Sequence, residues 1–102
     1  MKSIQTARRQ LAAGEFEFSQ HALRRTVERN ISAAEIQEAG AAAEIIENYP
    51  DDKYAPSALL LGFTAGGRPL HFQVSLAETE RTKIITIYEP ERTEWTGFRT
   101  RR

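Results

Sequence analysis

Apolar residues recur at helical spacing through the first part of the chain, and three short helices are expected there. Each candidate helix has its own start or stop signal: a glycine stop at Gly14, an N-cap at Ser19, and a capping box at Ser32-Ala-Ala-Glu35. The predicted helices are Ile4–Ala13, Ser19 to about Arg29, and a third from Ser32 to about Ala43. Asn30 suits the left-handed C-cap position after the second helix.

The hydrophobic period changes to two after the third helix, which predicts strands. A short alternating run at 15–18 is expected to be extended. Four longer runs are expected to be strands, 44–49, 58–64, 68–76 and 83–89, and the last two of them alternate between apolar and polar residues. Gly66-Gly67 predicts a two-residue hairpin turn, and Pro90 ends the last strand. The expected fold is therefore α+β, with N-terminal helices packed on one face of a four-stranded antiparallel sheet.

The alternation in the last two strands separates their side chains into two sets. Leu70, Phe72 and Val74 share one face of their strand, and a common core requires Ile85 and Ile87 of the next strand on the same side. The opposite face must then carry the polar set, which consists of His71, Gln73, Thr86 and Tyr88.

His71 and Tyr88 are the first candidates for chemistry. A two-residue turn places Gly62 opposite His71, and a symmetric loop places Tyr88 on its other side. A glycine beside the imidazole leaves a hollow for a ligand. Histidine can act as a general acid or base, and tyrosine can donate a hydrogen bond. The alternative is a half-exposed histidine on a solvated sheet face.

The second helix supplies another candidate group. At about 100° per residue, a polar sector lies opposite an apolar stripe of Ala22, Leu23, Thr26 and Val27. The polar sector contains His21, Arg24, Arg25 and Glu28, with Arg29 on its flank. A helix N-terminus favours anions, so this sector is a candidate phosphate-binding edge. The alternative is a surface helix with a ladder of i,i+4 charges.

Length and composition exclude several classes. A chain of 102 residues is expected to form one domain, over residues 1–102. It has no cysteine and only two histidines, so we expect no metal site, disulfide or cofactor. No apolar run approaches the roughly 20 residues of a membrane span, and no signal peptide is evident. We expect a cytoplasmic protein.

The net charge is zero, but the charges are unevenly distributed. The balance is +3 over residues 1–29, −6 over residues 30–52 and +3 over residues 53–102. Eleven of the fourteen basic residues are arginine, which suits bidentate contacts to phosphate or carboxylate. Either the basic ends pair with the acidic middle, or they form a surface for RNA or an acidic partner. Trp95 and Phe98 are expected to fold back, and the terminal arginines to fray.

The chain also resembles a known bacterial family over about residues 16–98. The residues that carry the resemblance are Phe18-Ser-Gln-His21-Ala22, Arg25, Glu28-Arg29-Asn-Ile31, Ile46-Glu-Asn-Tyr-Pro50-Asp51, Leu59-Leu-Leu-Gly62, Arg68-Pro-Leu-His71, Ile85-Thr86-Ile-Tyr88-Glu-Pro90 and Trp95. That family consists of small proteins catalogued as a domain of unknown function, often encoded beside zinc-finger antitoxins of the MqsA/YgiT type. It is grouped with the barnase–EndoU–colicin–RelE ribonuclease fold, in which helices precede an antiparallel sheet.

The resemblance implies a type II toxin that cleaves RNA without a metal and is paired with a zinc-finger antitoxin. Such cleavage needs a base, a cation near the phosphorane and an acid for the leaving oxygen. By the family's motif, His71 or His21 is the base or acid, Arg25 is the phosphate clamp, and Tyr88 is the orienting donor. Arg29, Thr86 and Gln73 are the expected substrate-binding residues.

Two other functions remain open from the sequence. The neutral net charge and the acidic third helix suit a non-catalytic module of the same fold that binds an antitoxin-like protein. An accessory protein that binds RNA without cleaving it is a third possibility.

Overall fold

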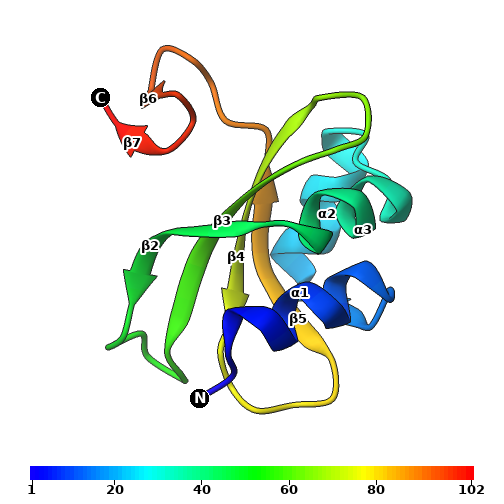
Figure 1. The fold of residues 1–102 in the computed structure, drawn as a ribbon, viewed down its shortest axis with the longest axis vertical. Helices are drawn as coiled ribbons and strands as arrows, with labels where there is room; N and C mark the ends of the chain where they lie inside the picture. Colours follow the sequence, from blue (N-terminus) through cyan, green and yellow to red (C-terminus); the bar gives the residue numbers. More distant parts are fainter.

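The computed structural model describes residues 1–102 as three helices, a five-stranded sheet and a separate two-stranded sheet (Figure 1). The helices are α1 (Ile4–Ala12), α2 (Gln20–Glu28) and α3 (Ala33–Ala41). The strands are β1 (Phe16–Phe18), β2 (Glu44–Tyr49), β3 (Ser57–Phe63), β4 (Pro69–Ser75), β5 (Thr82–Tyr88), β6 (Trp95–Thr96) and β7 (Thr100–Arg101). The result is a mixed α+β fold, as expected, with more strands than predicted.

The predicted helix signals are confirmed at the atomic level. The Ser19 hydroxyl accepts a hydrogen bond from the Ala22 amide at the start of α2. Ser32 and Glu35 form a complete capping box at the start of α3. Asn30 adopts a left-handed conformation with φ of 53°, which turns the chain between α2 and α3.

The prediction of four antiparallel strands was wrong in one respect. The large sheet has the order β1-β5-β4-β3-β2, and β1 pairs with β5 in parallel. The extended run after α1 is the extra strand: Phe16–Phe18 pairs with Thr82–Ile84. It covers the first three residues of β5, an edge that would otherwise leave unpaired backbone groups there.

The predicted register of the β3–β4 hairpin was wrong by one residue. Leu61 pairs with His71, and Gly62 pairs with Leu70. The loop holds three residues, Ala65-Gly66-Gly67, of which only Gly67 has a positive φ. A three-residue loop shifts the pairing by one and exchanges the two faces of β3. Gly62 therefore faces the helices, and the buried side chain of Leu61 lies beside His71.

A bulge corrects the expectation for β5. Gln73 pairs with Thr86, whereas Val74 pairs with Ile84, so Ile85 has no partner in the ladder. Ile84 and Ile87 are consequently fully buried, while Ile85 is only partly covered. The core-facing residues of this strand are therefore Ile84 and Ile87, and not Ile85 and Ile87.

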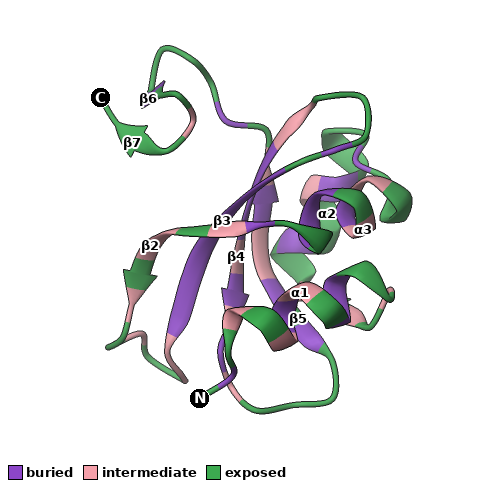
Figure 2. Ribbon diagram, in the orientation of Figure 1, coloured by how far each residue is buried: buried purple, intermediate pink, exposed green.

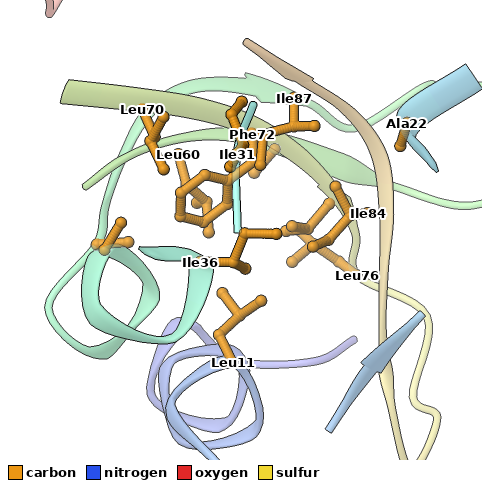
Figure 3. Close-up of a cluster of buried hydrophobic side chains, with 14 residues drawn as sticks. Leu11, Ala22, Ile31, Ile36, Leu60, Leu70, Phe72, Leu76, Ile84 and Ile87 are labelled. Carbon is orange, nitrogen blue, oxygen red and sulfur yellow. The ribbon is translucent and has the colours of Figure 1, made fainter. Parts of the chain in front are cut away.

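The core lies between the helices and one face of the sheet (Figures 2 and 3). Phe72 and Ile36 are among its largest fully buried side chains. The predicted stripe on α2 was only half right: Ala22 and Thr26 are buried, but Leu23 and Val27 are exposed. No helix is long and apolar enough to span a membrane.

A helix approaches the sheet closely at Gly62, and this contact yields a stability prediction. A Cβ atom there would lie 2.1 Å from the carbonyl oxygen of Ala39, a backbone atom that cannot rotate away. We expect Gly62→Ala to lower the free energy of unfolding by at least about 2 kcal/mol, because overpacking forces α3 away from β3. The measurement is urea unfolding followed by circular dichroism.

Gly66→Ala is the matched control. Its Cβ would have no neighbour closer than 3.9 Å, and Gly66 has no positive φ. We expect a change below about 0.5 kcal/mol, as for other surface substitutions. Equal stabilities for the two variants would contradict the close approach of α3 to the sheet.

Candidate functional site

His71 and Tyr88 lie side by side on the sheet face opposite the helices. They are directly paired residues of β4 and β5, and Gln73 and Thr86 form the next pair. The Tyr88 hydroxyl lies 3.2 Å from Nδ1 of His71, and the two rings meet edge to face. The prediction that these four residues share one face is confirmed.

The expected hollow beside the imidazole does not exist, because Leu61 takes the place predicted for Gly62. His71 is also covered from above by residues 91–102, which we call the C-terminal arm. The arm lies apart from the helices, at the upper left of Figure 1. Its Trp95 ring meets the imidazole at right angles, with 4.4 Å between ring centroids. The exposed fraction of His71 is 0%.

The arm also determines the proton positions on His71. Nε2 lies 2.6 Å from the carbonyl oxygen of Phe98, which can only accept a hydrogen bond. In the neutral ring Nε2–H therefore donates to Phe98, and Nδ1 accepts from the Tyr88 hydroxyl. Phe98 itself has a left-handed backbone with φ of 62° and follows Gly97 at 58°.

Two ion pairs attach the arm to β2. Nε of Arg99 lies 2.5 Å from Glu44. Arg101 donates two hydrogen bonds to Glu47, at 2.8 and 3.1 Å, and its guanidinium stacks on Trp95. The expectation that these arginines fray was therefore wrong, while Trp95 and Phe98 fold back as expected.

A small charged cluster thus surrounds the histidine and tyrosine. The hydrogen bond from Arg101 lowers the pKa of Glu47, which also accepts a hydrogen bond from the hydroxyl of Tyr49. Burial lowers the pKa of His71, an effect that the Phe98 carbonyl and Glu47 oppose in part. Burial raises the pKa of Tyr88. At neutral pH the centre therefore holds a neutral imidazole, a neutral phenol, a carboxylate and a guanidinium.

Gln73 belongs to a separate hydrogen-bonded group beside this cluster. Its amide donates to the Ser57 hydroxyl at 3.0 Å and to Asp52 at 3.3 Å. The hydroxyl of Ser57 holds the pKa of Asp52 below its ordinary value. Gln73 and Asp52 border an open hollow of about 530 Å³ at the end of β2.

The second candidate group, on α2, is not joined to the first. His21 is exposed, and its side chain forms no hydrogen bond or ion pair. Arg25 pairs with Glu28 at 3.4 Å. The ion pair on this helix therefore has i,i+3 spacing, and not the i,i+4 spacing that the sequence suggested. Arg29 is exposed, and its carbonyl accepts a hydrogen bond from Arg68. No hydrogen bond or ion pair links these residues to His71 or Tyr88.

Several residues of the cluster were missed in the sequence. Glu47, Tyr49 and Arg101 were not predicted as site residues, although Glu47 and Tyr49 alternate on β2 and so share a face. Arg101 gave no usable signal, because its partner lies 54 residues away.

No group of three or more His, Cys, Asp or Glu side chains is arranged to hold a metal ion.

The lowered pKa of His71 predicts a pH dependence of stability. The folded state favours the neutral ring, so His71 stabilises the fold above the unfolded pKa of about 6.5, and this contribution is lost as pH falls through the folded pKa. We expect the free energy of unfolding of the wild type, measured with urea, to fall between pH 7.5 and pH 5.0. The free energy of unfolding of His71→Gln should fall less over that range. Glu35, Glu47 and Asp52 lose their contributions only below about pH 4.5. Identical pH profiles for wild type and His71→Gln would contradict this assignment.

Comparison with known proteins gives one family match. The family model described as Domain of unknown function (DUF4258) matches residues 18–89, from the end of β1 through β5. No curated protein and no solved structure matches the chain. The matched segment contains both candidate groups and the whole β2–β5 meander, and it ends before the C-terminal arm. Because the match covers more than half of the chain, this protein belongs to the DUF4258 family.

Proposed function

We propose that this domain is a metal-independent endoribonuclease of the toxin type, which cleaves RNA by general acid and base chemistry at His71. The observation that carries the proposal is the hydrogen-bonded pair of His71 and Tyr88, two residues that face away from the core with Glu47 and Arg101 nearby. The family resemblance in the motifs around His21 and His71 supports the same function.

The groups present match the needs of RNA cleavage. A neutral imidazole can take the proton from a 2′-hydroxyl, whose oxygen then attacks the phosphorus. Burial lowers the pKa of His71, so the ring is neutral at physiological pH. Arg101 is a cation whose charge acts on His71 and can stabilise the charge on the phosphorane, and Tyr88 can donate a hydrogen bond to a phosphate oxygen. The displaced 5′-oxygen leaves with a proton from an acid, a role open to the histidinium formed in the first step.

RNA can reach this centre only when the C-terminal arm moves. In the closed arrangement the Trp95 ring and the Phe98 carbonyl occupy the space around the imidazole. Arg25, the clamp implied by the family motif, lies outside this cluster on α2. It can contribute only if the RNA backbone extends from the sheet face to α2, which packs against β5.

A substitution at His71 tests the proposal directly. We expect expression of the wild-type protein in bacteria to arrest growth, and His71→Gln to relieve the arrest. In a cleavage assay with purified protein and single-stranded RNA, the rate should fall by about 100-fold or more, the usual contribution of a general base. A folded His71→Gln protein that cleaves RNA at the wild-type rate would remove His71 from the mechanism.

The role of Arg25 has a matched control in its neighbour. Arg24 and Arg25 both lie on α2, but only Arg25 is a position of the family motif. We expect Arg25→Ala to reduce RNA cleavage by about tenfold or more, the cost of one phosphate contact that strengthens in the transition state. Arg24→Ala should leave the rate nearly unchanged. Equal effects of the two substitutions would reduce the role of Arg25 to that of general positive charge.

A second candidate function is a non-catalytic module that binds an antitoxin-like protein, such as a zinc-finger antitoxin. The specific observation in its favour is that both ring nitrogens of His71 have protein partners and that the ring is fully buried, as in a structural histidine. Absence of RNA cleavage by the wild-type protein, together with a stoichiometric protein complex, would favour this candidate over the ribonuclease.

A further inference from the structure

We propose that the C-terminal arm is a displaceable RNA-binding element: single-stranded RNA takes Arg99 and Arg101 from Glu44 and Glu47, and the arm then uncovers His71. The release step has its catalytic consequence only if the proposed ribonuclease function holds. The binding step does not depend on cleavage.

The residue types of the arm suit single-stranded RNA. Within residues 91–102 there are four arginines, one tryptophan and one phenylalanine against two glutamates. Arginine forms bidentate contacts with phosphate, and aromatic rings stack on unpaired bases. Arg92 and Arg102 have no carboxylate partner: Arg92 lies over the Phe98 ring, and Arg102 donates to a backbone carbonyl.

The contact between Arg101 and Glu47 has the geometry that a phosphate would use. Nε and Nη2 donate to the two carboxylate oxygens at 2.8 and 3.1 Å, a parallel fork that a phosphate accepts equally well. Glu44 and Glu47 therefore occupy the arginines of the arm much as two phosphates of an RNA strand would. The acidic middle of the chain thus competes with RNA for the arginines of the arm.

The arm is attached to the body mainly through side chains. No backbone–backbone hydrogen bond joins residues 91–102 to the five-stranded sheet; β6 and β7 pair only with each other. The arginine side chains of both ion pairs are more than half exposed, so water and salt weaken these pairs. The remaining anchors are the Phe98 carbonyl on His71, the Trp95 ring and an edge contact between Phe63 and Phe98. The arm can therefore leave as a unit without disrupting the sheet.

Trp95 provides the reporter for the experiment. It is the only tryptophan of the chain, and its exposed fraction in the closed arrangement is 3%. Its emission wavelength and its quenching by acrylamide therefore report the position of the arm alone. We would titrate the full chain with a 2′-O-methyl single-stranded oligonucleotide, which cannot be cleaved, and follow binding by fluorescence anisotropy of a label on the oligonucleotide.

We expect the oligonucleotide to bind and to increase acrylamide quenching of Trp95. The charge-neutralising variant E44Q/E47Q should bind several-fold more tightly than E78Q/E80Q, a control that removes the same charge from the loop before β5. The variant R99A/R101A should bind more weakly. Its slope of log K against log salt should be shallower than that of the wild type by about 1.4, the value for two lost phosphate contacts on a single strand.

Three outcomes would overturn the proposal: no binding of the oligonucleotide, a Trp95 that stays protected when the oligonucleotide is saturating, or equal affinities for E44Q/E47Q and its control. The wild-type tryptophan signal decides the question even if a variant fails to fold. A protected Trp95 in a protein that still cleaves RNA would refute release of the arm and leave the ribonuclease standing. Release of the arm in a protein that does not cleave RNA would support the displaceable arm and refute the ribonuclease.

Discussion

The alternation of side chains along β4 is the constraint on which the rest of the structure depends. Burial of Leu70, Phe72 and Val74 against the helices leaves the intervening side chains no place except the other face of the sheet. His71 therefore faces away from the core because of its neighbours. The antiparallel pairing with β5 then places Tyr88 beside it. The chemistry of the candidate site is thus a by-product of the same alternation that forms the core.

The sequence predicted those relations that follow from periodicity and local capping. The helices, the parity of His71 with Tyr88 and the capping box all rest on residues near one another in the chain. The prediction from the sequence failed where a shift of one residue changes which side chains share a face of the sheet. A Gly-Gly turn suits loops of two or three residues, and the difference exchanged Leu61 with Gly62 beside the imidazole. The Ile84-Ile85 pair is apolar in either register, so the bulge left no mark on the pattern.

The arm could not be placed from the sequence for a different reason. Its arginines find partners on β2, about 55 residues earlier, and no local pattern encodes such a pairing. The uneven distribution of charge did indicate that basic and acidic segments could pair. Three ion pairs join acids of the middle segment to later arginines: Glu35–Arg68, Glu44–Arg99 and Glu47–Arg101. Neutrality of the whole chain therefore reflects internal pairing between segments, and the surface potential changes when a pair opens.

The left-handed backbone at Phe98 places a conformational cost inside the arm itself. Phe98 lies in the turn between β6 and β7, where a side chain larger than glycine costs about 1 kcal/mol or more. The pairing of β6 with β7 offsets that cost whether or not the arm is docked, because the two short strands pair only with each other. The carbonyl oxygen that Phe98 presents to His71 is therefore positioned by the arm's own hairpin, and docking needs no rearrangement of this turn.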